Sequence, residues 1–298
     1  MATAKEFQST DIRNVVILGH GGSGKTTLID ALCFSTNTSR RHGSVKDGTA
    51  LTMYTEEEIE HGISMQTSLA FADWNGIKVN LLDTPGYLDF TGEAIAATRV
   101  ADGAVVVLGA TTGVEVGTEK VWDYTLARAI PRLFFVSMMD KEHANFDKSI
   151  NEIRTHMTEK AYAAELPIGE GENFRGIINL FTGRAHIFKQ GTVTGEYDEA
   201  DIPEELKDEA ELRRTELFEA IATTNDALLE RYLEGGEITT AEAQAACKHA
   251  MLAGELFPVF CGAMEKTRGT RALLQGLVEI VPSPAEAPHD VAQRPRLA

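Results

Sequence analysis

The chain has 298 residues, of which 43% are hydrophobic and 24% are charged, a balance typical of folded globular proteins and not of disordered or fibrous ones. Its formal net charge of −17 argues against broad binding of a nucleic-acid backbone, because most of the surface would repel phosphates. The three cysteines, Cys33, Cys247 and Cys261, form no Cys-x-x-Cys pair and predict neither a zinc site nor a disulfide framework.

No part of the sequence indicates a membrane-bound or exported protein. The opening MATAKEFQSTDIRN has no apolar core of a signal peptide, and no apolar run is long enough to cross a bilayer. Widely spaced, unpaired cysteines are typical of a reducing compartment. We therefore expect a cytoplasmic location and no membrane association.

Short apolar runs alternate along the chain with longer stretches of helical periodicity. Apolar runs of this length are typical of strands buried in a parallel sheet. The alternation predicts an α/β fold with a doubly wound, mostly parallel sheet, in which ligands bind at the carboxyl ends of the strands. The predicted strands are Val15–Leu18, Val79–Leu82, Ala104–Leu108, Leu133–Val136 and Leu256–Phe260, and the predicted helices are Thr26–Phe34, Gly92–Ala101, Glu115–Ala129 and Phe146–Met157.

One segment, 159–255, interrupts this alternation. It begins with a glycine-rich, turn-rich part and continues with two highly charged helical stretches, Ile202–Leu233 and Thr239–Leu252. Because the strand that follows resumes the first pattern, we interpret 159–255 as an α+β subdomain inserted into a domain formed by 11–158 and 256–284. Residues 1–10 are predicted to be an N-terminal tail, and the proline-rich 285–298 a C-terminal linker.

Residues 19–26 read GHGGSGKT and fit the pattern G-x-x-x-x-G-K-[ST] of a phosphate-binding P-loop. The glycines let backbone N–H groups surround a polyphosphate, Lys25 reaches the outer phosphates, and the Thr26 hydroxyl binds Mg²⁺. The motif lies between a predicted strand and a predicted helix, whose N-terminus adds positive potential. The residues predicted to hold the phosphates are Gly21, Gly22, Ser23, Gly24, Lys25, Thr26 and Thr27.

A second polar motif, Asp83-Thr84-Pro85-Gly86, follows the predicted strand Val79–Leu82. A carboxylate at that strand end can hold Mg²⁺ through water, and the Gly86 N–H can contact a γ-phosphate. Between the two motifs, Thr36–Thr67 is polar and has no convincing core pattern. This stretch is where a mobile switch would lie, ordered only by γ-phosphate and Mg²⁺.

Several longer segments resemble the N-terminal GTPase domain of elongation factor G. They are HGISMQTSLAF, LLDTPGYLDF, ADGAVVVLGATTGVEVGTEKVW, DKEHANF, FPVFCGA and VPSP, while ENFRGIINL and LLERYLEGGEIT resemble the inserted G′ subdomain of that factor. The resemblance extends from about residue 11 to about residue 288. The form GHGGSGKTT and the Tyr after DTPG are more similar to the elongation factor G-like paralogue branch. The resemblance implies a P-loop NTPase fold that binds GTP and GDP with Mg²⁺ and hydrolyses GTP.

The same resemblance assigns roles around the phosphates. Thr26 and Asp83 match magnesium-site positions of the family, and Ser64 stands where the family has the switch I threonine. Gly22 replaces the usual P-loop aspartate, which removes a charge from the phosphate site. The ribosome is implied as a partner for a full-length parent only.

Tyr87 stands where translational GTPases carry the histidine that positions the attacking water. A neutral phenol can accept or donate a hydrogen bond but offers no imidazolium, so we expect Lys25, Gly86 and Tyr87 to support only slow hydrolysis. Two interpretations of Tyr87 remain open: it positions water weakly, or it packs against the switch.

The base-recognition motif departs furthest from the family. Where relatives have Asn-Lys-x-Asp, this chain has Ser137-Met138-Met139-Asp140. The Asp140 carboxylate can accept from guanine N1–H and the 2-amino group, Met138 can stack on the base, and Ser137 is too short for the contact to N7. A second motif, Gly262-Ala263-Met264, replaces Gly-Ser-Ala of relatives, and the N–H near Ala263 can meet guanine O6.

Three functions follow from these residues. The first is a Mg²⁺-dependent GTP-binding and GTP-hydrolysing domain. The second is a nucleotide-gated binding module that binds GTP and GDP but does not hydrolyse, motivated by Tyr87 and Gly22. The third is a P-loop ATPase or kinase unrelated to translation, motivated by the altered base motif. In each case we expect a monomer with no sequence-specific nucleic-acid contact.

Overall fold

A seven-stranded sheet forms the centre of the structure, a computed structural model that describes residues 6–287. Only its edge strand β2 runs antiparallel to its neighbour, joined to β3 by a tight turn at Asn75–Gly76. The other neighbouring strands pair in parallel, which confirms the predicted doubly wound, mostly parallel sheet. The order across the sheet is β2 (Ser68–Trp74), β3 (Ile77–Asp83), β1 (Ile12–Gly19), β4 (Gly103–Gly109), β5 (Arg132–Ser137), β11 (Phe257–Cys261) and β6 (Ala161–Ala163).

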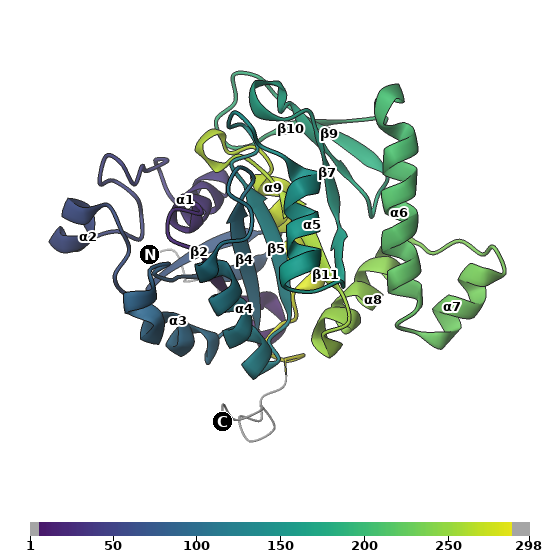
Figure 1. Ribbon diagram of the computed structural model, residues 1–298, viewed down its shortest axis with the longest axis horizontal. Coiled ribbons are helices and arrows are strands. Elements are labelled where there is room, and N and C mark those ends of the chain that lie inside the picture. The colour runs from purple at the N-terminus through teal and green to yellow at the C-terminus, as the bar shows by residue number, and fades with distance from the viewer. Residues whose placement is uncertain (1–5, 288–298) are drawn as a thin grey trace.

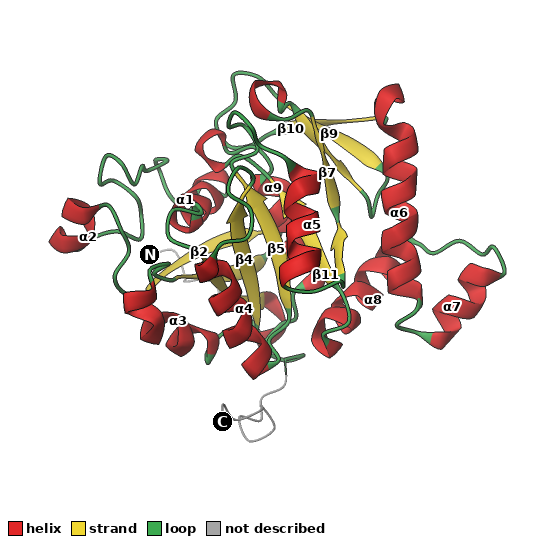
Figure 2. Cartoon of the chain, viewed as in Figure 1, coloured by secondary structure: helices red, strands yellow, loops and turns green. Residues whose placement is uncertain are grey.

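Helices cover both faces of this sheet (Figures 1 and 2). On one face lie α1 (Lys25–Ser35) and α9 (Thr270–Ile280), which pack on each other and on β2 and β3. The other face carries α3 (Thr91–Thr98), α4 (Val116–Arg128) and α5 (Phe146–His156). Every residue of β4 and of β5 is buried between these layers. The five predicted strands and four predicted helices agree with these elements to within three residues at each end, whereas β2 and α9 were not predicted.

The inserted segment forms a second sheet beside the first. This sheet is antiparallel, in the order β10-β9-β8-β7. Helix α6 runs beside it and contacts β6, and α7 and α8 lead back to the main sheet (Figure 1). The elements are β7 (Glu165–Ile168), β8 (Gly176–Asn179), β9 (Arg184–Phe188), β10 (Tyr197–Ala200), α6 (Lys207–Ala222), α7 (Asp226–Leu233) and α8 (Thr240–Ala253).

Three details of the predicted organisation change. The stretch predicted as one helix, Ile202–Leu233, is two helices, because the Asn225 side chain accepts a hydrogen bond from the N–H of Leu228 and starts α7 anew. Strand β6 lies within the segment assigned to the insert but pairs with β11, so we place the start of the insert at β7. The first residues of the predicted linker pack on the body, where the Glu286 carboxylate accepts from Lys248 of α8, and residues 288–298 lie outside the described part of the chain.

None of the helices in the described residues combines the length and the apolar character needed to span a bilayer.

Candidate nucleotide-binding site

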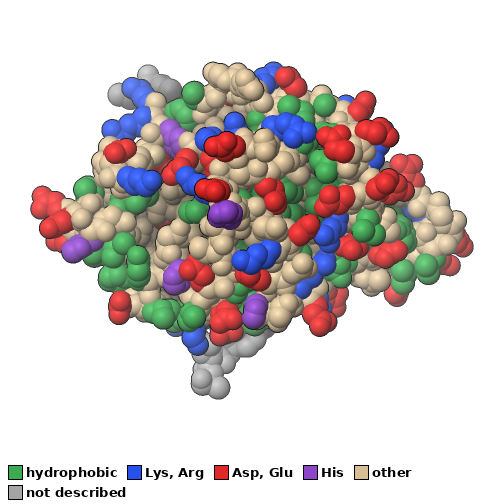
Figure 3. Space-filling model, turned by 45° about the horizontal axis from the view of Figure 1, so that its top comes forward, with side chains coloured by type: hydrophobic (Ala, Val, Ile, Leu, Met, Phe, Trp, Pro, Cys, Tyr) green, Lys and Arg blue, Asp and Glu red, His purple; other side chains and the backbone are tan. Residues whose placement is uncertain are grey.

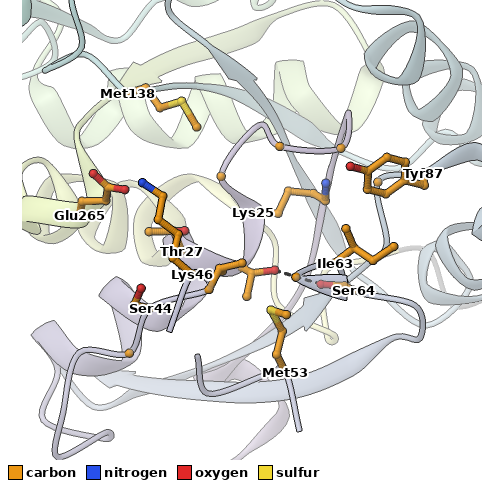
Figure 4. Close-up of a pocket in the computed structure, with 18 of the residues that line it drawn as sticks. Lys25, Thr27, Ser44, Lys46, Met53, Ile63, Ser64, Tyr87, Met138 and Glu265 are labelled. Carbon is orange, nitrogen blue, oxygen red and sulfur yellow. Dashed lines mark hydrogen bonds between the residues drawn. The ribbon is translucent and has the colours of Figure 1, made fainter. Parts of the chain in front are cut away.

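A cavity of about 560 Å³ lies at the carboxyl ends of the central strands (Figure 4). Its floor is the loop between β1 and α1, and the segment 42–64 and the start of the loop after β3 form its walls. The residues predicted for the phosphates meet here: Gly21, Gly22, Gly24, Lys25, Thr26, Thr27 and Gly86 line the cavity, and Ser23 is buried beneath it. Lys46 also lines it, so two lysines face one cavity of a strongly acidic chain.

The Lys25 ammonium is held inside the loop that surrounds it. Its Nζ donates to the carbonyl oxygens of Gly19 (3.0 Å) and His20 (2.8 Å). Burial lowers the pKa of Lys25 to about 8, and the nearby Asp83 carboxylate opposes that shift. A cation with so little water around it is favoured by an anion in the cavity, as expected of a phosphate-binding lysine.

Gly86 and Gly21 allow two loops to touch. A Cβ on Gly86 would lie 2.3 Å from the Nζ of Lys25 and 2.6 Å from the backbone N of Gly21, so only glycine fits between them. A Cβ on Gly21 would lie 3.0 Å from the ring of Tyr87. The Tyr87 ring therefore rests on the P-loop backbone and lines the cavity next to Lys25, although 45% of the residue is exposed (Figure 4).

Three oxygen-bearing side chains predicted for the metal converge beside the P-loop lysine. The hydroxyls of Thr26 and Ser64 are 3.1 Å apart, so the structure brings the switch residue onto the P-loop. Asp83 is buried, and its Oδ1 has no hydrogen-bond partner among the described residues. Burial raises the pKa of Asp83, against hydrogen bonds from Thr52 and Thr26 and the charge of Lys25.

This donor set fits Mg²⁺, which prefers a few oxygen ligands from the protein and completes its shell with water and phosphate. Within the described part of the chain no three His, Cys, Asp or Glu side chains form a metal cluster. The cavity therefore does not fit a metal whose ligands are all His, Cys, Asp or Glu side chains. One carboxylate and two hydroxyls leave room for phosphate oxygens.

The segment between the two phosphate motifs has more internal structure than the sequence predicts. Thr52 is buried, and its hydroxyl donates to Asp83 Oδ2 at 2.5 Å. The buried Glu58, in the short helix α2 (Glu56–His61), accepts from the N–H groups of Met65 and Gln66 and so fixes the loop that carries Ser64. Carboxylates of the chain itself therefore hold parts of this stretch, and its ordering by γ-phosphate and Mg²⁺ stays a prediction.

The base end of the cavity continues into a recess of about 40 Å³ lined by Gly24, Thr27, Ser137, Met138, Asp140, Lys141, Met264 and Glu265. The Ser137 hydroxyl donates to the carbonyl of Ser23 in the P-loop (2.6 Å), so it joins two loops and does not reach toward a base. Met138 adopts a left-handed backbone conformation (φ 62°) that is rare for a residue with a side chain. Its methyl group lies near Gly24 on the wall of both cavities.

The two remaining base-recognition groups already have partners. The Asp140 side chain is only 4% exposed and pairs with the Nζ of Lys266 at 2.8 Å. The N–H of Ala263, predicted to meet guanine O6, donates instead to the carbonyl of Arg268 at 2.9 Å, so a bond to O6 would have to come from a neighbouring amide. Gly262 and Met264 are buried beside it.

Comparison with known proteins decides the family. The family model described as "Elongation factor Tu GTP binding domain" matches residues 10–283. The chain belongs to this family. A crystal structure of the protein ttk003000868 from Thermus thermophilus has the same fold, with a TM-score of 0.86 and 37% sequence identity. The match covers 93% of this GTP-binding domain and 41% of the Thermus chain, so the domain spans less than half the length of that protein.

These matches confirm the resemblance to translational GTPases of the elongation factor G type. The sequence motifs located the P-loop, Asp83, Gly86 and Asp140 of this GTP-binding domain. They did not indicate Thr52, and they did not indicate Lys266.

Proposed function

We propose that this chain is a Mg²⁺-dependent domain that binds GTP and GDP and hydrolyses GTP slowly, in an elongation factor G-like protein. The observation that carries the proposal is the contact between the hydroxyls of Thr26 and Ser64, 3.1 Å apart, beside the buried Lys25. It joins the P-loop to the switch at one point, where a magnesium ion and a γ-phosphate would bind together. If residues 19–26 were only a glycine-rich turn that binds no nucleotide, nothing would require this contact.

Different residues of the chain have different roles in phosphoryl transfer. Lys25 and the P-loop N–H groups hold and neutralise the phosphates. Magnesium, when bound by Thr26, Ser64 and Asp83, supplies further charge to the phosphate oxygens. The close fit of Gly86 against Lys25 supports a role for its N–H as a donor to the γ-phosphate. Tyr87 lines the same cavity, and its hydroxyl is our candidate for orienting a water there.

The second candidate is a guanine-nucleotide-gated binding module that does not hydrolyse. The contact between the Tyr87 ring and Gly21 supports it, because a ring packed on the P-loop is not free to position water. A P-loop ATPase is the weakest candidate. Adenine offers no donor pair to the buried Asp140 carboxylate and so gains no hydrogen bond there, whereas guanine would supply two donors.

We place the domain in the cytoplasm as a monomer and assign ribosome binding to the longer protein alone. On the face drawn in Figure 3, the described Lys and Arg side chains are interspersed with Asp and Glu. This mixture and the net charge of −17 support the expectation that the domain makes no sequence-specific contact with nucleic acid.

The guanine assignment is tested by exchanging the hydrogen-bonding groups of Asp140. We expect GDP with Mg²⁺ to raise the melting temperature by mass action and ADP to raise it far less. Asp140→Asn should weaken GDP by at least about 10-fold and strengthen xanthosine diphosphate, because an amide offers a donor to the xanthine carbonyl. Calorimetric titration of both nucleotides measures this, with Asp123→Asn on the exposed face of α4 as the control. Equal stabilisation by ADP and GDP would contradict the proposal.

Slow hydrolysis is tested at Tyr87. The isolated chain should release phosphate slowly over many turnovers, since each missing transition-state contact costs about 10²-fold or more in rate. Tyr87→His should leave GDP affinity nearly unchanged and should raise turnover only when an activator orders the switch. Tyr87→Phe separates the two interpretations: an unchanged rate means that the phenol only packs. Brisk turnover by the unaltered chain would show that another group positions the water.

A further inference from the structure

Two loops border the base end of the cavity, and each carries an acid next to a lysine. The loop after β5 provides Asp140 and Lys141, and the short 3₁₀ helix after β11 provides Glu265 and Lys266. They pair crosswise: Lys266 Nζ lies 2.8 Å from Asp140 Oδ2, and Lys141 Nζ lies 2.7 Å from Glu265 Oε2. We call these two ion pairs the clasp.

The four side chains of the clasp differ sharply in exposure. Asp140 is 4% exposed, whereas Lys266 is 51%, Lys141 44% and Glu265 52% exposed. A buried carboxylate needs a partner, whereas an exposed lysine can turn to water at little cost. Lys266 is thus the partner of Asp140, and its exposure allows a competing donor to displace it.

The clasp is not what shapes the second loop. The N–H groups of Ala263 and Arg268 each donate to the carbonyl of the other, at 2.9 and 3.0 Å. The Thr267 hydroxyl donates to the carbonyl of Val193 in the β9–β10 connection at 3.0 Å. These three hydrogen bonds hold the loop in place without help from the two ion pairs.

We propose that the clasp gates the base pocket, with Lys266 as a specificity-determining residue that competes with the guanine base for Asp140. The inference rests on the proposed guanine binding. N1–H and the 2-amino group of guanine can replace the ammonium at the carboxylate. Adenine has no such donors on that edge, so it cannot replace Lys266 at Asp140, and the clasp stays closed. The clasp therefore costs guanine some affinity and excludes bases that cannot open it.

The test is Lys266→Met in the whole chain, which removes the ammonium and keeps an apolar stem. Stopped-flow binding of a fluorescent GDP at low salt should show association faster by about 2–10-fold, with a similar gain in affinity, because the competitor is gone. The gain should shrink at high salt, since salt weakens the clasp of the parent chain. In an Asp140→Asn background, Lys266→Met should change nothing.

Lys189→Met is the matched control, because Lys189 pairs with Asp198 at 2.8 Å in the insert and is 43% exposed. It alters the net charge equally but leaves the clasp intact. If Lys266→Met binds GDP no faster than this control, or binds it more weakly, the gating proposal is wrong. Lys266 would then orient the Asp140 carboxylate. If the parent chain binds no GDP, the proposed function fails together with the clasp. Binding by the parent with no effect of Lys266→Met overturns the clasp alone.

Discussion

Lys25→Met should stabilise the nucleotide-free chain and at the same time abolish its stabilisation by GDP. Lys25 is buried, and its pKa falls from 10.5 to about 8 in the folded state. The unfolded chain therefore binds more protons between these pH values, and the cost of burying the charge is fully present below about pH 8. A neutral methionine removes that cost but leaves the carbonyls of Gly19 and His20 without a donor, so the net gain should be about 1–3 kcal/mol at pH 7.

The effect of Lys25→Met on nucleotide binding is unfavourable, unlike its effect on the stability of the nucleotide-free chain. Without the ammonium the outer phosphates lose their strongest partner, and GDP affinity should fall at least about 100-fold. Thermal unfolding with and without Mg-GDP, from pH 6 to about pH 10, measures both effects. The stability gain should shrink as the pH approaches 10, where the parent lysine is neutral in the folded chain. Lys120→Met, on the exposed face of α4, should change neither quantity. A variant that is less stable when empty and still responds to GDP would refute this account of Lys25.

Glu165→Gln should flatten the pH dependence of stability. Glu165 opens β7, is fully buried, and its Oε2 accepts from the N–H of Cys261 at 3.2 Å. Burial raises its pKa to about 8, against the opposing effect of that hydrogen bond. The folded chain therefore keeps a proton that the unfolded chain loses from about pH 4.5, and stability falls as the pH rises through this window. Glutamine is neutral at every pH, so the variant does not lose stability as the pH rises.

Urea unfolding over a pH series measures the effect of Glu165→Gln. We expect the variant to be more stable than the parent by about 2–4 kcal/mol at pH 8 and to match it within about 1 kcal/mol at pH 5. Glu172→Gln, exposed in the same inserted segment, should leave the pH profile unchanged. Parallel profiles for Glu165→Gln and the parent would mean that Glu165 is already ionised in the folded chain.

The phosphate end of the site could be predicted from the sequence because its chemistry lies in the backbone and in local spacing. A P-loop and an Asp-x-x-Gly turn each act within a few residues, directly after a strand. The contacts of Thr52 with Asp83 and of Lys266 with Asp140 join side chains that are distant in sequence. No local pattern contains them, so only the folded structure could reveal them.

The missed elements have different causes. In β2 the large side chains of Leu69 and Phe71 point outward, and the small Ala70 and Ala72 are buried. Residues 69–72 form an apolar run, but two of the four are alanines, which strands disfavour, so this edge strand is only weakly marked in the sequence. Helix α9 is different, because its buried leucines recur at helical spacing and the signal was present. The charged stretch Ile202–Leu233, which contains α6 and α7, was predicted as one helix because charge patterning does not reveal the hydrogen bond by which Asn225 caps α7.

The place of β11 in the main sheet has a consequence for how the chain is made. This strand lies between β5 and β6, yet the whole insert separates it from both in the sequence. As the chain leaves the ribosome, β5 and β6 emerge with a gap between them, and their facing edges stay unpaired until β11 follows. Unpaired edges are prone to join other chains. The antiparallel sheet of the insert, built from neighbouring hairpins, has local contacts and can form during that interval. We therefore expect the inserted sheet to form before the main sheet is complete, and β11, the strand that leads into the base-recognition loop, to close the main sheet last.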